Sequence, residues 1–253
     1  MKDIKEKISI IMPAYNEAEH IRISVEETIK TFEDFGCNWE LIVIDDGSTD
    51  STPKILEELV PKYPGQLLVG TNPSNMGKGE AIKNALNLVS GDYVVFLDAD
   101  LDLHPLQVQT LFDIMRLDNA DIVIGSKLHP NSIVQYPLER KIASYVYYLL
   151  VKLMFNLPCH DTQTGLKLFK VEVLRKVFPK ILVKKYAFDL EVLVVAHSLG
   201  FRIAEAPIVL KPQRIYYGRI GYNAINDTFR DTLAVFYRMK ILKYYDRIDH
   251  HSG

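Results

Sequence analysis

The sequence predicts an α/β fold with a mostly parallel central sheet flanked by helices, and three observations support this prediction. Short apolar runs alternate with helical patterns over residues 8–126, which is typical of strand–helix–strand units. Several runs are apolar throughout, as expected for parallel strands that are buried on both faces. Acidic and turn-forming residues follow these runs, where open α/β sheets place their ligands.

In the first half, strands are expected at residues 8–12, 39–44, 67–70, 93–97 and 121–125. Helices are expected up to about residue 35, then from Pro53, from about 77 to 89, and from about 105 to 116. Pro53 and Pro105 fall in first helical turns, where proline is favoured because its missing N–H is not needed there.

The second half is less regular. After a helix at 138–155, we expect a strand at 166–169, a helix at 188–198, a strand at 202–210 and a final amphipathic helix at 227–245. The helix at 138–155 is apolar nearly all round, which leaves two interpretations. It is either a buried core helix or a helix in a membrane interface, with Arg140, Lys141 and Lys152 near the headgroups.

Composition excludes several classes of protein. The 253 residues are enough for one α/β domain with a sizeable core, and the net charge of −2 excludes a broad field that binds nucleic acid. Cys37 and Cys159 indicate neither a disulfide framework nor a zinc site, which favours a reducing, cytoplasmic compartment. No run of 18 apolar residues occurs, so we expect no membrane-spanning helix, and the charged start is unlike a signal peptide.

Two acids, Asp98 and Asp100, flank a single residue at the end of the predicted strand 93–97. Carboxylates this close repel each other unless protons or a cation hold them together. Mg²⁺ and Mn²⁺ prefer such oxygens and leave positions for substrate phosphates, so the pair is a candidate metal site. The alternative is a helix N-cap, because Asp is favoured there and Pro105 soon begins a helix.

Four motifs occur in order at predicted strand ends. They are Pro13-Ala14-Tyr15-Asn16-Glu17, Asp45-Asp46-Gly47-Ser48-Thr49-Asp50, Asn75-Met76-Gly77-Lys78-Gly79 and Asp98-Ala99-Asp100. Together they resemble family 2 glycosyltransferases of the GT-A fold over about residues 8–126. Asp161-Thr162-Gln163-Thr164-Gly165-Leu166-Lys167-Leu168-Phe169 and Ala187-Phe188-Asp189-Leu190-Glu191 are similar to the branch that loads a hexose onto dolichyl or polyprenyl phosphate. They are closest to dolichyl-phosphate β-glucosyltransferases, and dolichyl-phosphate mannose synthases share the layout.

The resemblance implies a GT-A catalytic domain at residues 1–225, with a nucleotide-sugar half at 8–126. The acceptor half at 127–225 would include the helix 138–155, and residues 226–253 would form an amphipathic helix and tail.

For the donor, the resemblance implies that Asp98 and Asp100 are catalytic and hold Mg²⁺ or Mn²⁺ against the diphosphate, which stabilises the leaving group. Asp102 is an additional acid that would join the metal or cap the next helix, and the preference of Asp for caps favours the second role. Gly77 and Lys78 begin a helix, where backbone N–H groups and a positive charge favour an anion. The residues expected around the base, ribose and diphosphate are Pro13, Tyr15, Glu17, Asp46, Gly77, Lys78, Asp98 and either Arg214 or Arg219.

For the acceptor, a lipid phosphate is already an anionic nucleophile, so its site needs cations for positioning more than a general base. The resemblance implies phosphate contacts from Lys127, where the family usually has Arg, and from Arg140 and Ser144, four residues apart on one helix face. Asp161 and Gln163 are expected to be catalytic residues that face the sugar or the acceptor, with a plain polar loop as the alternative.

Asp189 and Glu191 interrupt an apolar helix and fall on different faces of it. Buried acids are costly unless paired, so at least one of them is expected to meet a site or a basic partner.

The expected activity is metal-dependent, inverting transfer of a hexose from UDP-glucose, or GDP-mannose, to dolichyl or polyprenyl phosphate at the cytosolic face of a membrane. The protein would be cytoplasmic and bind the membrane peripherally, through the helices 138–155 and 227–245 and with or without a membrane partner subunit. The alternatives are a family 2 transferase that acts on a saccharide hydroxyl and a nucleotide-sugar-binding protein without turnover.

Overall fold

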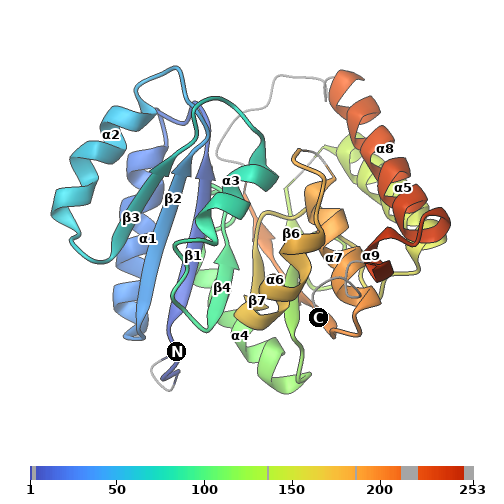
Figure 1. Ribbon diagram of the computed structural model, residues 1–253. Helices are drawn as coiled ribbons and strands as arrows, with labels where there is room; N and C mark the ends of the chain where they lie inside the picture. The colour runs from blue at the N-terminus through green and yellow to red at the C-terminus, as the bar shows by residue number, and fades with distance from the viewer. Residues whose placement is uncertain (2–3, 136, 186, 212–221, 248–253) are drawn as a thin grey trace.

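The computed structural model describes residues 1, 4–135, 137–185, 187–211 and 222–247 (Figure 1). Within these residues the central sheet has seven strands in the order β3-β2-β1-β4-β7-β5-β8. Its strands are β1 (Ile8–Ala14), β2 (Trp39–Asp45), β3 (Leu67–Thr71), β4 (Tyr93–Phe96), β5 (Ile122–Ser126), β7 (Lys167–Lys170) and β8 (Ile203–Pro207). All neighbours are parallel except β7, which runs antiparallel to both β4 and β5. The predicted α/β class with a mostly parallel sheet is confirmed.

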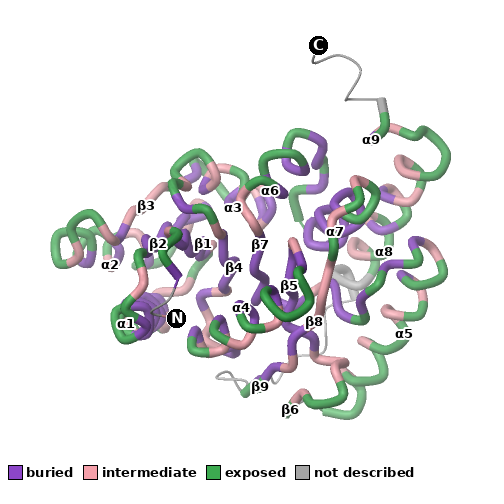
Figure 2. The backbone as a smooth tube through the Cα atoms, turned by 90° about the horizontal axis from the view of Figure 1, so that it is seen from below, coloured by how far each residue is buried: buried purple, intermediate pink, exposed green. Residues whose placement is uncertain are grey.

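Helices cover both faces of the sheet. One layer contains α1 (Ile21–Phe35), α2 (Thr52–Leu59) and α4 (Val108–Leu117), and the other contains α3 (Lys78–Ala85), α6 (Val171–Val177) and α7 (Phe188–Ser198). Along β1, Ile10 and Met12 pack into the first layer and Ile11 into the second, which explains the absence of polar alternation. Figure 2 shows the buried strand positions between α1 and α4 on one side and α3 and α6 on the other.

Several element boundaries differ from the prediction. The helix expected to reach residue 89 ends at Ala85, and the one expected at 105–116 begins with a 3₁₀ turn at Pro105–Gln107. The strand expected at 202–210 is divided after Pro207, which has no N–H to donate, and β9 (Val209–Leu210) pairs instead with β6 (Ile133–Val134). The prediction missed β6 and the 3₁₀ turn Phe178–Lys180. It also missed α6, because no Gly or Pro separates this helix from β7.

The C-terminal segment is not the single helix expected at 227–245. It consists of α8 (Tyr222–Phe236), a π-helical stretch at Tyr237–Ile241 and α9 (Tyr244–Arg247). The chain turns between the last two at Lys243, whose φ of 46° cannot continue a helix. A further 3₁₀ turn, Val60–Lys62, follows α2.

Helix α5 (Leu138–Phe155) has the predicted bounds, and only Val151 and Phe155 are buried in it. The interpretation of this helix as a buried core helix is therefore wrong. Its exposed apolar residues recur at helical spacing and are Leu138, Ile142, Tyr145, Val146, Leu149 and Leu153. Among the described residues, no helix combines the length and the apolar character needed to cross a membrane.

Candidate active site

A cleft of about 300 Å³ lies where the carboxyl ends of β1, β2 and β4 meet the first turn of α3. Its lining residues come from the four motifs singled out in the sequence and are Pro13, Ala14, Tyr15, Glu17, Asp46, Asn75, Gly77, Lys78, Asp98, Ala99 and Asp100. The structure thus brings together every predicted donor residue except Arg214, which lies, like Arg219, outside the described residues.

Three charged side chains dominate the cleft. Lys78 Nζ lies 2.7 Å from Asp98 Oδ1, and burial together with the charges of Asp98 and Asp102 raises the pKa of Asp100 to about 6. Burial acts to lower the pKa of Lys78, but the carboxylates of Asp189, Asp98 and Asp100 outweigh it and hold the pKa above its ordinary value. The repulsion between Asp98 and Asp100 is of the kind that a divalent cation would relieve.

The alternative interpretation of Asp98 and Asp100 as N-caps of the helix that begins at Pro105 is wrong. His104 is the N-cap, and its Nδ1 accepts a hydrogen bond of 3.1 Å from the backbone N–H of Leu106. Asp100 Oδ1 instead accepts from the backbone N–H of Asp102. Among the described residues no three His, Cys, Asp or Glu side chains are grouped to hold a metal. Asp98 and Asp100 are the residues of the cleft that could hold a divalent cation.

Asp46 shapes the cleft from the end of β2. Its Oδ1 accepts hydrogen bonds from Asn72 Nδ2 at 2.7 Å and Met76 N at 3.0 Å, and its Oδ2 accepts from Gly77 N at 2.8 Å. Gly77 has a φ of 96°, and a Cβ there would lie 2.5 Å from the carbonyl oxygen of Lys184, so both the conformation and the space require glycine. These contacts fix the turn that places Lys78 in the cleft.

The second half of the chain reaches the same cleft through the loop 161–165. A Cβ on Gly165 would lie only 1.9 Å from Asp98 Oδ2, so this backbone sits directly against the acid. Sequence spacing gave no sign of this approach, which depends on β7 running back between β4 and β5.

A buried ion pair that the sequence analysis did not assign lies beneath the cleft. Lys167 is 1% exposed, and its Nζ contacts Asp189 Oδ1 at 2.6 Å and the carbonyl oxygen of Thr164. Asp189 Oδ2 also lies 3.7 Å from Lys78 Nζ. Burial opposes ionisation of Asp189, but Lys167 and Lys78 outweigh it and hold its pKa below the usual range. A lysine within the apolar strand and an acid within the apolar helix were the sequence signals of this pair.

Asp161 organises the predicted acceptor region. It is 6% exposed and accepts hydrogen bonds from Lys127 N at 2.9 Å, Thr164 Oγ1 at 2.5 Å and Gln163 N at 3.1 Å. Lys127 Nζ lies 3.4 Å from Asp161 Oδ2. Although burial raises it, the pKa of Asp161 is lowered overall by Lys127 and by these hydrogen bonds.

A small cavity of about 40 Å³ adjoins this region, and its lining includes Lys127, Ser144, Tyr147, Asp161 and Gln163. Ser144 and Tyr147 face it from α5, and Tyr147 continues the contact to α8 through a hydrogen bond of 3.1 Å with Thr232. The structure therefore brings four of the five predicted acceptor-side residues together. Arg140, one helical turn before Ser144, is half-buried and does not line the cavity.

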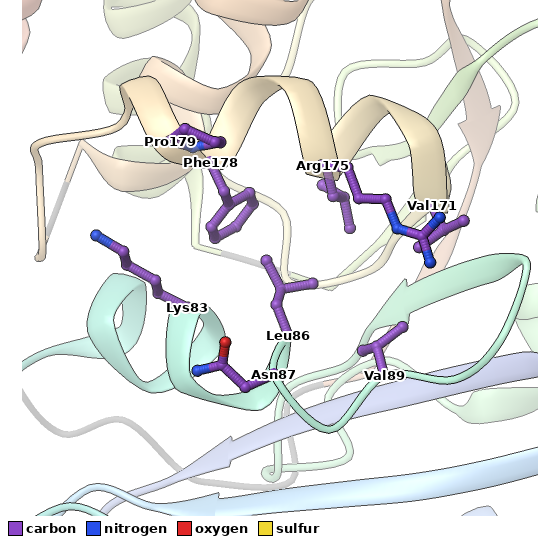
Figure 3. Close-up of a pocket in the computed structure, with 9 residues that line it drawn as sticks. Lys83, Leu86, Asn87, Val89, Val171, Arg175, Phe178 and Pro179 are labelled. Carbon is purple, nitrogen blue, oxygen red and sulfur yellow. The ribbon is translucent and has the colours of Figure 1, made fainter. Parts of the chain in front are cut away.

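A larger groove of about 330 Å³ lies elsewhere, between α3 and α6 (Figure 3). Leu86, Val89, Val171 and Phe178 give it an apolar floor, and Lys83 and Arg175 stand at its rim. The described residues that line it include no acid.

Comparison with known proteins assigns the class. The family profile of glycosyl transferase family 2 matches residues 9–178, and the chain belongs to this family. It is 33% identical over 210 residues to a dolichyl-phosphate beta-glucosyltransferase of Trichomonas vaginalis, which covers 79% of this chain and 64% of the relative. It is 32% identical over 213 residues to a dolichyl-phosphate beta-glucosyltransferase of Dictyostelium discoideum, with 79% and 65% covered. The chain thus spans less than two thirds of the length of these relatives.

Among solved structures, the chain is similar to glucosyl-3-phosphoglycerate synthase from Mycobacterium tuberculosis in complex with Mn²⁺, uridine diphosphate and phosphoglyceric acid. The TM-score is 0.69 at 26% identity, over 92% of this chain and 78% of that one. The GT-A fold inferred from the sequence is confirmed.

Proposed function

We propose that the protein transfers a hexose from a nucleotide-diphospho-sugar to a polyprenyl (dolichyl) phosphate with inversion. UDP-glucose is the first donor proposed and GDP-mannose the second. The names of the two curated relatives support a glucosyl donor and a dolichyl-phosphate acceptor, and the uridine diphosphate bound by the M. tuberculosis enzyme supports a uridine nucleotide.

One observation carries the choice of acceptor. Asp161 and Asp189, two acids that the second half of the chain contributes to this region, are each paired with lysine, and each has a lowered pKa. A general base for a sugar hydroxyl works best with a pKa near the working pH, so these two carboxylates suit that role poorly. A phosphate acceptor is already ionised and needs no base, which fits such a site.

In the proposed reaction, an oxygen of the lipid phosphate attacks the anomeric carbon as the bond from that carbon to the diphosphate breaks. The electron pair leaves with the nucleoside diphosphate, so no proton has to be moved. Lys78 would neutralise charge on the diphosphate, and Lys127 and Ser144, which line the small cavity, would position the acceptor phosphate. Arg140, one turn before Ser144 on α5 and outside that cavity, would reach the phosphate from its rim. A divalent cation held by Asp98 and Asp100 would stabilise the charge that develops on the leaving group.

The exposed apolar residues support a peripheral contact with the membrane, proposed to be its cytosolic face. On α5 six of them recur at helical spacing, and on the C-terminal segment Phe229, Leu233, Tyr237 and Ile241 recur every four residues. The two segments contact each other through the rings of Phe155 and Phe236, whose centroids are 5.9 Å apart. Figure 1 shows α5 beside α8, and α5 also lines the cavity of the proposed acceptor site, so the two segments would form an apolar surface near that site.

A transfer assay tests the reaction. Purified protein would be incubated with Mg²⁺ or Mn²⁺, dolichyl phosphate and radiolabelled UDP-glucose or GDP-mannose, with a soluble saccharide acceptor in parallel. We expect label in the organic phase with one donor, and none with an Asp98→Ala, Asp100→Ala variant. Product formed only with the saccharide would show that the acceptor is a sugar hydroxyl and would refute the lipid phosphate as acceptor. Nucleotide binding without any product would leave a binding protein and refute the proposal.

Liposome flotation tests the membrane contact. An Ile142→Ser, Leu149→Ser, Leu153→Ser variant should lose flotation with dolichyl-phosphate liposomes, because about 2 kcal/mol of transfer free energy is lost with each large apolar side chain. Leu117→Ser on α4 is the matched control, since Leu117 is 82% exposed on a different helix. Unchanged flotation of the triple variant would refute this surface as the membrane contact.

A further inference from the structure

A fully buried acid, Glu191, joins the C-terminal segment to the rest of the protein. Its Oε1 accepts hydrogen bonds from Tyr245 Oη at 2.5 Å and from Arg238 Nη2 at 3.0 Å, and Arg238 Nε also contacts Tyr245 Oη at 3.2 Å. Its Oε2 accepts from the backbone N–H groups of Leu182 and Val183 at 2.9 and 2.6 Å. Four donors from two separate segments therefore converge on one carboxylate.

The segment on the Oε2 side packs against the start of α3, which lines the donor cleft. This segment, residues 181–185, contains Leu182 and Val183, which bind Glu191. It also contains Lys184, whose carbonyl oxygen accepts a hydrogen bond of 2.9 Å from Gly79 N. The same carbonyl oxygen is the atom that leaves no room for a Cβ on Gly77. The position of this segment therefore sets the position of the first turn of α3, which presents Lys78 to the cleft.

Helix α7 provides a second connection from Glu191. Asp189 and Glu191 both lie in its first turn and point in different directions, as the sequence spacing predicted. Asp189 contacts Lys167 and Lys78, while Glu191 contacts the C-terminal segment. Any shift of this turn moves Asp189 relative to Lys78.

We propose that Arg238 and Tyr245 are positioning residues for donor binding, which act through Glu191 on the segment 181–185 and on Lys78. The inference rests on the proposed function in one respect, that the cleft binds a nucleotide-diphospho-sugar. Neither residue lines the cleft. Tyr237 and Ile241 of the proposed membrane surface lie in the same π-helical stretch as Arg238.

The first test measures UDP-glucose and GDP-mannose affinity by calorimetry and transfer kinetics for Arg238→Gln and Tyr245→Phe. We expect the donor KM and Kd to rise about fivefold or more, with kcat at saturating donor nearly unchanged, since a hydrogen bond to a charged group is lost away from the reacting atoms. Lys240→Gln is the matched control. It removes a positive charge from an exposed position in the same stretch and should behave as wild type.

A double-mutant cycle separates positioning from general stability. Glu191→Gln should raise the donor Kd by itself, and Arg238→Gln in that background should add little further, because its partner has already lost its charge. Equal effects in both backgrounds, or a lower melting temperature with unchanged donor affinity, would overturn the proposal.

Amide hydrogen exchange provides a readout that needs no donor. In Arg238→Gln, the amides of Gly79, Leu182 and Val183 should exchange several-fold faster than in wild type, and those of β1 should not change. Unchanged exchange at these amides overturns the positioning inference whatever the donor is. A wild-type protein that binds neither donor would refute the proposed function alone.

Discussion

Gly165→Ala is the sharpest test of how the two halves of the chain meet. The added Cβ would lie 1.9 Å from Asp98 Oδ2 and 2.3 Å from its Cγ, whereas real contacts need at least 3.0 Å. The carboxylate must therefore move by about 1 Å or rotate, which breaks its 2.7 Å ion pair with Lys78. Displacements of this size typically cost about 100-fold in rate, so we expect kcat/KM for transfer to fall about 100-fold.

Stability should respond much less. Gly165 does not have a positive φ, and a surface carboxylate can rotate cheaply, so the free energy of unfolding should change by no more than about 1 kcal/mol. Gly65→Ala is the opposite control. The φ of 77° at Gly65 strains alanine, but an added Cβ would meet no atom within 4 Å. The free energy of unfolding should therefore fall by about 1 kcal/mol, while kcat/KM for transfer stays unchanged. Transfer kinetics and urea unfolding of both variants decide the matter. Wild-type kcat/KM in Gly165→Ala would refute the placement of Asp98 against this loop.

Three further predictions follow from buried ionisable side chains. Lys167→Met leaves Asp189 with only its longer contact of 3.7 Å to Lys78 and should destabilise the fold by up to about 3–5 kcal/mol in urea unfolding, with partial recovery when Asp189→Leu is added. A double variant no more stable than the single one would contradict this account. Burial raises the pKa of Glu40, but hydrogen bonds from Lys7, Ser9 and Ser90 outweigh it and lower the pKa overall. Its stabilisation is therefore complete above about pH 4.3 and lost as the pH falls below it, and Glu40→Gln should flatten that part of the stability–pH curve. Burial and the nearby Glu205 and Asp161 raise the pKa of Cys159 to about 12, so Ellman's reagent at pH 8 should modify Cys37 first, and equal rates would contradict the burial of Cys159.

The sequence by itself determined the fold class and most of the residues that line the cleft. The end of a strand can be predicted locally, because an apolar run followed by acids or glycines indicates a strand and then a turn whatever packs beside it. Asp98 and Asp100 were identified in this way, whereas Asp46, Gly77 and Lys78 were identified by the resemblance to family 2 glycosyltransferases, and the structure brings all five together in one cleft. Helix α5 was also predicted within its observed bounds, since a long apolar run between prolines is a local signal.

What the local pattern could not give was the partner of each acid. The sequence placed Asp189 and Glu191 on different faces of α7, but it could not show that Lys167 and Lys78 meet one and Arg238 and Tyr245 the other. It also left α5 open between core and surface, because an apolar residue reads the same in either setting.

Only the tertiary structure decided these points, through one topological feature. Strand β7 runs antiparallel between β4 and β5, which places the loop 161–165 against Asp98 and Lys167 beneath the cleft. Strand order depends on the packing of both sheet faces at once, and the free energy of that packing belongs to contacts between residues far apart in the chain. The sequence thus fixes which chemical groups are available at the cleft, and long-range packing decides which of them are neutralised and which are left to act.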